Sequence, residues 1–221
     1  MRILKPDLDR LRRCGIPEVV YGEFKSKEDL VNIAYFFLSK CGRIIVTKID
    51  KPKANYVSKK TRVRGCSVKY SPKAKVLVVK KKKLNVKKMG EVGILTAGTS
   101  DIPIAEEARI VAEELGCATI TEYDVGIAGV HRLYPALKRM TNAGALVVVA
   151  GMEGALPSVV SGLVDVPVIG VPTSVGYGVS HKGEAALHTM LNSCTPVAVV
   201  NIDNGYGAAV LAYQIVKPKN G

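Results

Sequence analysis

Five repeats of one pattern run from residue 91 to residue 216, each an apolar segment followed by a longer segment with apolar residues at helical spacing. Two of the apolar segments, Ala145–Ala150 (ALVVVA) and residues 197–200 (VAVV), carry no polar side chain on either face of a strand. Strands that are apolar on both faces lie in parallel sheets that helices cover from both sides. This half of the chain therefore predicts an α/β fold with a three-layer, doubly wound parallel sheet.

The predicted elements of this half alternate strictly. Strands are expected at residues 92–97, 118–122, 145–150, 166–171 and 197–202, and helices at residues 103–115, 130–143, 154–164, 180–193 and 205–216. In the first repeat, Ser100 or Asp101 can cap the helix, Pro103 fits its first turn, and Gly116 suits a left-handed C-cap. The N–H groups of such a first turn attract anions, although a capped helix without a ligand would use the same residues.

The distribution of charge divides the chain in two. The net charge is +13, but residues 1–90 contain 25 Lys and Arg against 7 Asp and Glu, whereas residues 91–221 contain 7 against 12. Two halves of opposite charge indicate two units. We therefore predict a small basic α+β domain over residues 1–89 and a larger domain over residues 90–221.

Within the first domain the pattern is less regular. A polar helix within residues 7–13, a strand within 15–24, a helix over 26–38 capped by Ser26, and strands over 43–49 and 75–80 are expected. Residues 50–68 are rich in Lys, Arg, Pro and Ser and predict an exposed loop or edge hairpin. The basic charge suggests RNA or another anion as a partner, but its tyrosines form no stacking pattern, so a solvated lysine surface is preferred and nucleic acid is not expected.

The five cysteines, Cys14, Cys41, Cys66, Cys117 and Cys194, are scattered and form no C-x-x-C pair. They predict neither a disulfide framework nor a zinc site. The first 20 residues hold five basic side chains with no hydrophobic segment behind them, and no run approaches the ~20 apolar residues of a membrane span. We expect a cytoplasmic protein with no membrane segment.

Ligands of doubly wound sheets bind at the carboxyl ends of the strands. Each predicted strand here ends in a polar, glycine-rich segment: 98–101 (GTSD), 123–126 (YDVG), 151–154 (GMEG), 172–178 (PTSVGYG) and 203–206 (DNGY). Glycine lets backbone N–H groups approach an anion closely. Substrate contacts are therefore expected from Gly98, Thr99, Asp124, Gly151, Met152, Gly154, Thr173, Ser174, Gly176, Gly178, Asn201, Asp203 and Asn204.

Two further candidates follow the second strand. His131 and Arg132 lie at the start of a predicted helix, where Arg132 suits a phosphate or carboxylate. A capping histidine and a surface arginine are the alternative interpretation. Because His181 and His188 have no partners at ligand spacing, no protein metal site and no tightly bound cofactor are predicted, and a Mg²⁺ ion on a substrate diphosphate is compatible with the sequence.

The segments 98–101, 151–157 (GMEGALP) and 168–172 (VIGVP) resemble those of the aminoimidazole ribonucleotide carboxylase and mutase family of purine synthesis, over residues 91–216. The resemblance implies a flavodoxin-like sheet and a homo-oligomer, with the octamer of those enzymes as a candidate. The sequence departs from the family in two ways: its first loop is one residue shorter, and Glu153 and Ala155 lie where the second loop of the family carries its catalytic histidine. Purine-type catalysis is therefore an alternative, as is a non-enzymatic nucleotide- or RNA-binding protein.

Further segments are similar to the LarB family: 15–23 (GIPEVVYGE), 124–133 (DVGIAGVHRL), 191–194 (LNSC) and 201–205 (NIDNG). LarB proteins are the carboxylase/hydrolases that open synthesis of the nickel-pincer nucleotide cofactor of lactate racemase. The resemblance implies nicotinic acid adenine dinucleotide and CO₂ or bicarbonate as substrates. It also implies carboxylation of the pyridinium ring at C5 and cleavage of the phosphoanhydride, which gives AMP and pyridinium-3,5-biscarboxylic acid mononucleotide.

Four residues are expected to carry this chemistry. A pyridinium ring attacks CO₂ only after a nucleophile has added to it, and Cys194, next to the LNS segment, is the candidate thiolate. Glu153 is the candidate base, with burial against Met152 and Leu156 expected to suit it to that role. Ser100 and Asp101 are expected to position the pyridine carboxylate, CO₂ or the ribose. A small buried cysteine and a glutamate at a helix start are the alternative interpretations.

Overall fold

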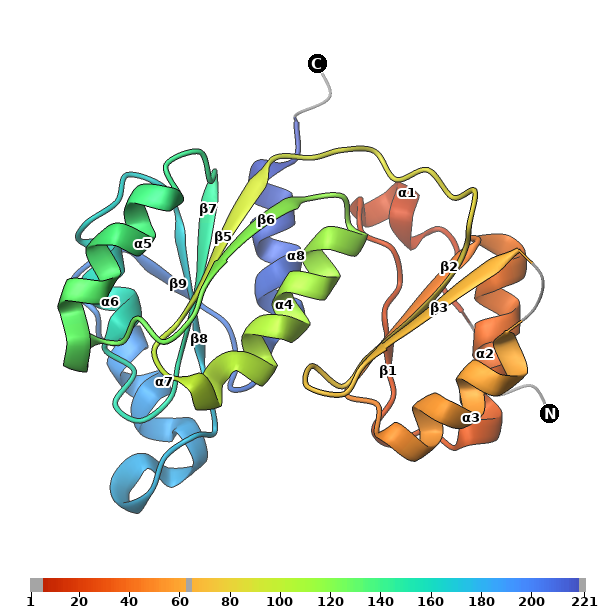
Figure 1. Cartoon of the computed structure of the whole chain (residues 1–221), viewed down its shortest axis with the longest axis horizontal. Coiled ribbons are helices and arrows are strands. Elements are labelled where there is room, and N and C mark those ends of the chain that lie inside the picture. The colour runs from red at the N-terminus through yellow and green to blue at the C-terminus, as the bar shows by residue number, and fades with distance from the viewer. Residues whose placement is uncertain (1–5, 63–64, 219–221) are drawn as a thin grey trace. The chain divides into compact units, whose positions relative to one another are not determined.

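The computed structural model describes residues 6–62 and 65–218, and it divides the chain into two compact units, Met1–Val86 and Lys87–Gly221 (Figure 1). We call these unit 1 and unit 2. The boundary predicted from sequence lies at residue 89, a few residues further on. Each unit has its own sheet and its own apolar core.

Unit 1 contains a four-stranded mixed sheet. Its strands follow the order β1 (Val20–Tyr21), β2 (Arg43–Thr47), β4 (Val76–Lys81) and β3 (Cys66–Ser71), with β1 parallel to β2 and the other pairs antiparallel. The short helix α1 (Arg10–Cys14) precedes the sheet, and α2 (Lys27–Lys40) and α3 (Lys51–Thr61) pack apolar side chains against it. The Ser26 hydroxyl caps α2 by accepting a hydrogen bond from the Asp29 N–H, as predicted. The α+β class expected for this unit is confirmed.

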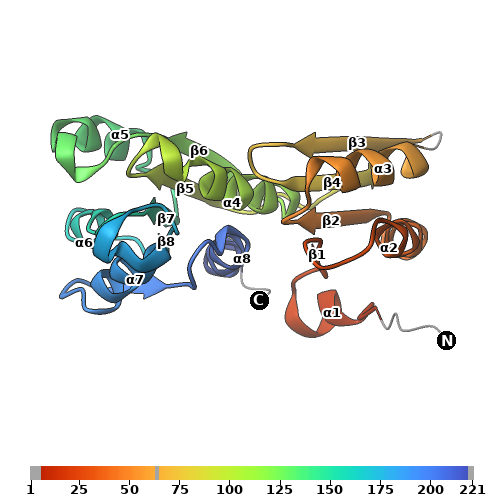
Figure 2. The ribbon, with the colours of Figure 1, turned by 90° about the horizontal axis from the view of Figure 1, so that it is seen from below.

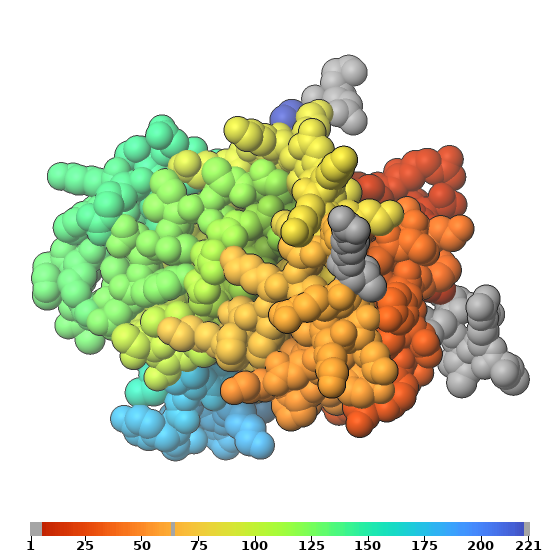
Figure 3. Space-filling view, turned by 45° about the vertical axis from the view of Figure 1, so that its right-hand side comes forward, coloured from red at the N-terminus to blue at the C-terminus, as the bar shows by residue number. Residues whose placement is uncertain are grey.

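The loop predicted over residues 50–68 is wrong, because helix α3 occupies most of it. Asp50 caps the helix by accepting a hydrogen bond from the Lys53 N–H at 2.8 Å. The helix fully buries three residues at helical spacing, Ala54, Val57 and Thr61. Four of the eleven residues of α3 are lysines, so the amino-acid composition predicts a loop although the buried positions follow helical spacing. The helix and the strand pair that follows it form much of the surface drawn in orange to yellow in Figure 3.

Unit 2 contains a five-stranded parallel sheet. Its strands follow the order β6 (Ala118–Glu122), β5 (Glu91–Thr96), β7 (Ala145–Ala150), β8 (Val168–Pro172) and β9 (Val197–Val199). One row of the register joins Ile94 of β5 to Val147 of β7 and Val147 to Ile169 of β8. All three side chains are fully buried, as the apolar strands require. This strand order is that of the flavodoxin-like folds, so the predicted doubly wound sheet is confirmed.

Helices cover both faces of this sheet. Helices α4 (Ile102–Glu114) and α8 (Gly205–Val216) pack together on one face, and α5 (Leu133–Arg139), α6 (Leu156–Ser161) and α7 (Glu184–Leu191) cover the other (Figure 2). The core on the second face joins Leu146 and Val148 of β7 to Leu133 and Met190 of the helices. The sheet is therefore closed on both faces, and its strand ends remain available for ligands.

The boundaries of several elements differ from those predicted. The helices expected at 130–143 and 180–193 begin late, because the 3₁₀ segments η2 (Ile127–Arg132) and η3 (Gly178–Gly183) come first. Strand β9, at one edge of the sheet, has three residues rather than the six expected. Gly116 has the left-handed backbone expected of it, with φ 101°.

Gly93 in the middle of β5 offers a test of this packing. A Cβ atom there would lie 2.8 Å from Met140 Sδ and closer still to Leu146 Cδ2, and both side chains are buried. Gly93→Ala should therefore lower the free energy of unfolding by about 1–3 kcal/mol through overpacking, measured by urea unfolding. The control is Gly162→Ala, whose Cβ meets nothing closer than 3.6 Å and which should change stability by less than about 1 kcal/mol. Equal effects of the two substitutions would contradict this account.

Candidate functional site

The carboxyl ends of the five parallel strands of unit 2 meet along one edge of the sheet, which we call the carboxyl rim. The segments that form it are 97–101, 123–132, 151–155, 173–183 and 200–204. From β5 the chain adds β6 on one side and then β7, β8 and β9 on the other, so the topological switch point lies between β5 and β7, and the first and third segments flank it. Ligands of open α/β sheets bind at this point.

Backbone hydrogen bonds join the segments after β5 and β6. The Asp124 N–H donates to Thr96 Oγ1 at 3.0 Å, and the Val125 N–H donates to the Thr96 carbonyl at 2.9 Å. A Cβ atom on Gly126 would lie 2.5 Å from the Ala97 carbonyl oxygen, so no side chain fits between the two segments. Thr96 was not a predicted site residue, although a threonine that closes an apolar strand is a signal that sequence analysis could have used.

Asp101 lies inside the rim rather than on it. Its side chain is 3% exposed, its Oδ2 accepts a hydrogen bond from the Gly98 N–H at 2.9 Å, and its Oδ1 accepts one from the Thr173 hydroxyl at 2.7 Å. Two predictions, one for Asp101 and one for Gly98, are therefore corrected. The carboxylate does not cap α4, and it occupies the Gly98 N–H that was expected to face an anionic ligand.

Burial raises the pKa of the Asp101 carboxyl above its ordinary value. Hydrogen bonds from Thr173, Gly98 and Gly151 act in the opposite direction, and the negative charge of Asp203 adds to the rise. These donors come from the segments after β5, β7 and β8. One buried carboxylate therefore ties three segments of the rim together.

The glycines of the segment after β7 are required for packing. A Cβ on Gly151 would lie 2.5 Å from both Thr173 Oγ1 and the Val175 carbonyl oxygen, and Gly154, with φ +69°, lies against the backbone of Ala186. Met152 has φ 54°, which is uncommon for a side chain of this size, and its N–H donates to the Val175 carbonyl at 2.8 Å. The segment is thus held in one conformation that exposes the side chain of Met152.

Glu153 does not have the surroundings predicted for it. Its side chain is exposed, so the expected burial against Met152 and Leu156 is absent. Leu156 is buried in the core beneath the segment, whereas Glu153 and Met152 both extend to solvent. Glu153 follows the left-handed residue Met152 in this exposed turn.

The segments after β8 and β9 are joined by Asp203. Its Oδ1 accepts a hydrogen bond from the Ser174 N–H, and its own N–H donates to the Pro172 carbonyl, both at 2.9 Å. Asn204 caps α8 by accepting from the Gly207 N–H, and Asn201 accepts from the Ile202 N–H. The structure therefore gives these three predicted substrate ligands roles in shaping the rim.

Segment 173–183 carries the most exposed apolar side chains of the rim. Tyr177 is 81% exposed and Val179 is 84% exposed, whereas Ser180 is buried. Gly176, Gly178, Gly183, His181 and Lys182 all have positive φ. Backbone in such conformations persists where neighbouring contacts determine it, and it is frequent in functional segments.

Arg132 is the positively charged group that the structure fixes on the rim. Its Nη1 donates to Asp124 Oδ2 at 2.6 Å, and its guanidinium lies over Gly129, whose Cβ would be 2.6 Å from Nε. Three more polar residues are exposed on the rim: His131 in the same segment as Arg132, and Thr99 and Ser100 in segment 97–101. A guanidinium held in this way retains donors for a phosphate or a carboxylate.

Cys194 lies at the opposite edge of the sheet from the rim. It precedes β9, and the first residue of β9, Val197, pairs with Val168, the first residue of β8. Thr195 Oγ1 donates to the Ser158 carbonyl, which holds the turn against α6. The thiol is exposed, and within one chain it lies at the opposite ends of the strands from Glu153.

The other cysteine of unit 2, Cys117, also lies at the amino edge, just before β6. Burial raises the pKa of its thiol to about 11, so it is a poor nucleophile at neutral pH. In the described part of unit 2, therefore, neither cysteine lies on the carboxyl rim of its own chain.

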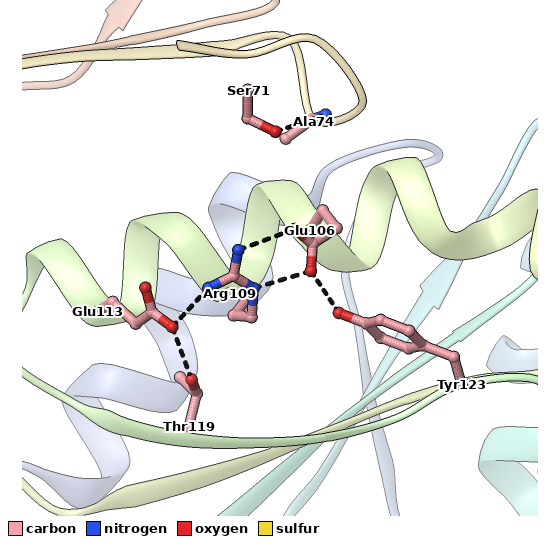
Figure 4. A network of polar contacts seen from close by, with 7 residues as sticks. All are labelled: Ser71, Ala74, Glu106, Arg109, Glu113, Thr119 and Tyr123. Atoms are coloured by element: carbon pink, nitrogen blue, oxygen red, sulfur yellow. Dashed lines mark hydrogen bonds and ion pairs between the residues drawn. The ribbon is translucent and has the colours of Figure 1, made fainter. Parts of the chain in front are cut away.

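A polar network fastens helix α4 to strand β6 (Figure 4). The guanidinium of Arg109 donates to both carboxylate oxygens of Glu106, at 2.7 and 2.8 Å, and to Glu113 at 2.6 Å. Thr119 donates to Glu113 and Tyr123 donates to Glu106. Burial, with the negative charge of Glu106, raises the pKa of the Tyr123 phenol, which keeps it a donor. The network fixes Tyr123, the residue that opens the second rim segment.

Within residues 6–62 and 65–218, no group of three or more His, Cys, Asp or Glu side chains could hold a metal ion. No helix in the same ranges is long and apolar enough to cross a membrane.

The raised pKa of Asp101 predicts how stability depends on pH. A buried carboxyl with a raised pKa stabilises the fold when it is protonated, and this contribution is lost as the pH rises through the raised value. The free energy of unfolding of the wild type, minus that of Asp101→Asn, should therefore decrease as the pH rises from about 3 to neutrality. Chemical unfolding of both proteins across this range measures the difference, in which shared titrations cancel. A difference that increases with pH would contradict the assignment.

Two family models match the chain. The model described as LarB/PurE-like N-terminal domain matches residues 1–82, and the model described as AIR carboxylase matches residues 91–220. The two matches correspond to unit 1 and unit 2.

Curated relatives agree with these matches. An uncharacterized protein of Methanocaldococcus jannaschii is 52% identical over 97% of this chain and 84% of its own length. N5-carboxyaminoimidazole ribonucleotide mutases of Pyrococcus horikoshii and Thermotoga maritima are 35% and 32% identical, over 57% and 58% of this chain and 71% and 75% of their own lengths. The chain therefore belongs to the AIR carboxylase family, among those members that carry a LarB/PurE-like N-terminal domain.

Proposed function

We propose that this chain carboxylates the pyridinium ring of nicotinic acid adenine dinucleotide at C5 and hydrolyses its phosphoanhydride, which releases pyridinium-3,5-biscarboxylic acid mononucleotide and AMP. The observation that carries the proposal is the combination of a LarB/PurE-like N-terminal domain with an AIR carboxylase domain in one chain. The sequence of residues 151–157 supports it. This stretch contains no histidine, and Glu153 and Ala155 lie near the position where purine-type enzymes of the family carry their catalytic histidine.

The pyridinium ring must become electron-rich before it can react with CO₂. A thiolate that adds to C4 converts the cation into a neutral enamine, and C5 then forms a carbon–carbon bond with CO₂. A base removes the proton from C5, and the C4–S bond breaks with its electron pair returning to sulfur. The ring is aromatic again, and the cycle needs neither an oxidant nor a reductant.

The thiol in this proposal comes from a second copy of the chain. In unit 2, Cys117 is buried, and Cys194 is exposed at the edge of the sheet opposite to the carboxyl rim. An exposed thiol can meet a substrate held by another subunit, whereas it cannot reach across its own sheet. The expected homo-oligomer is thus part of the mechanism.

The remaining roles belong to the rim. Arg132, held by Asp124, binds a phosphate or the ring carboxylate, and the exposed Thr99 and Ser100 position the substrate beside it. Glu153 keeps the role of base, because it extends from the segment that flanks the topological switch point. A subunit that covers the rim would exclude water from this carboxylate and strengthen the electrostatic interactions there.

The first experiment incubates the full chain with nicotinic acid adenine dinucleotide and ¹³C-bicarbonate, and follows AMP and the labelled mononucleotide by mass spectrometry. We expect both products, and Cys194→Ala should slow ring carboxylation by on the order of a thousandfold or more, because it removes the nucleophile. The matched control is Cys41→Ala, an exposed cysteine of unit 1, which should retain activity. Turnover of aminoimidazole ribonucleotide instead of the dinucleotide, or undiminished carboxylation by Cys194→Ala, would contradict the proposal.

A second experiment tests whether two copies share one site. Cys194→Ala and Arg132→Ala should each be inactive, but a mixed assembly contains sites with an intact rim from one chain and an intact thiol from the other. Co-expression with different tags should restore about a quarter of the wild-type activity, the statistical share of such sites. Mixed assemblies that are shown by their tags to form and yet stay inactive would refute the shared site.

A further inference from the structure

An apolar pocket lies at the amino edge of the unit 2 sheet. It has a volume of about 690 Å³ and lies between the end of α5, the start of β7 and the connection from α6 to β8. Its apolar lining includes Leu137, Met140, Leu146, Leu163, Val164 and Val166. Leu163 is 45% exposed at its mouth. A pocket of this size and lining can receive one or two large apolar side chains.

The carboxyl rim carries two such side chains. Tyr177 and Val179, at 81% and 84%, are the most exposed large apolar residues described in unit 2. They flank Gly178, whereas Ser180 behind them is buried and anchors the segment. Large apolar side chains exposed to this degree on one short segment are typical of an interaction surface.

The two features lie at opposite edges of the same sheet, because segment 173–183 follows the carboxyl end of β8 and the α6–β8 connection precedes its amino end. One chain therefore cannot fill its own pocket with this segment, but a second copy can. We propose that Tyr177 and Val179 of one copy insert into the amino-edge pocket of a second copy, in a head-to-tail contact.

Charge supports the same pairing. Lys182 of the segment and Glu184, the first residue of α7, follow Val179, and Asp165 and Lys138 line the pocket. All four side chains are exposed, and none of them forms an ion pair within the described residues. Each surface thus carries one positive and one negative side chain, so a second copy can pair both charges at the pocket, which an uncharged apolar ligand cannot do.

The contact also explains how a thiol could reach the rim. The turn that contains Cys194 packs on α6, since the Ser161 hydroxyl donates to the Pro196 carbonyl at 2.8 Å and Thr195 Oγ1 donates to the Ser158 carbonyl at 3.0 Å. The residues that follow α6 line the pocket. A rim segment docked there lies beside the Cys194 turn of the other copy. This consequence rests on the proposed function, whereas the docking rests on the two surfaces alone.

The test introduces opposite charges on the two sides of the contact. The measured quantity is the mass of the assembly that the full chain forms in solution. Val179→Asp and Leu163→Lys should each weaken self-association by at least about tenfold, because each places a charge in an apolar contact. The double variant should recover much of the association, since the new aspartate and lysine then face each other. Phe24→Ser removes an apolar side chain that is 86% exposed in unit 1 and should leave association unchanged.

Light scattering after gel filtration, with circular dichroism to show that each variant is folded, gives the answer. A monomeric wild type, single variants that associate like the wild type, or a folded double variant that stays dissociated would each overturn the proposal. The outcome is separable from that of the proposed function. If the single variants dissociate, the double variant reassociates and Cys194→Ala is fully active, the docking is supported and the thiol mechanism is refuted.

Discussion

The hydrogen bond that Thr173 donates to the buried carboxylate of Asp101 is the interaction on which the carboxyl rim depends. A carboxylate that is removed from water is costly unless several donors face it, so donors from separate segments must converge on it. They come from Gly98, Gly151 and Thr173, which follow three different strands. The geometry of the rim at the switch point is therefore determined by a carboxylate that is almost completely buried.

This arrangement separates residues that shape the rim from residues that can meet a ligand. Asp203, Asn204 and the glycines at 151 and 154 hold the segments together through hydrogen bonds and close packing. The exposed groups are fewer, and among them Arg132 has the best-defined position, because Asp124 holds it by an ion pair. A rigid rim with a small number of exposed polar groups is the arrangement expected of a site that orients a nucleotide.

The two edges of the unit 2 sheet carry complementary halves of the proposed chemistry. The carboxyl rim offers an arginine, hydroxyls and a carboxylate, and the amino edge offers an exposed thiol and an apolar pocket. In a parallel sheet, residues that follow strands and residues that precede them are separated by the length of the strands. Chemistry that needs both edges therefore needs more than one chain, and a head-to-tail contact is the simplest way to supply it.

The sequence by itself determined the α/β alternation of residues 91–216, the helix caps at Ser26 and Gly116, and the division into two units, because these depend on local periodicity, capping and charge. It also placed the polar segments at strand ends, which a parallel sheet must bring to one edge. Tertiary structure alone decided that Asp101 is buried, that Glu153 is exposed and that Cys194 lies at the far edge. Those outcomes depend on which segments pack together, and neither residue type nor spacing along the chain encodes the direction of a side chain after a left-handed turn or the edge at which a loop emerges.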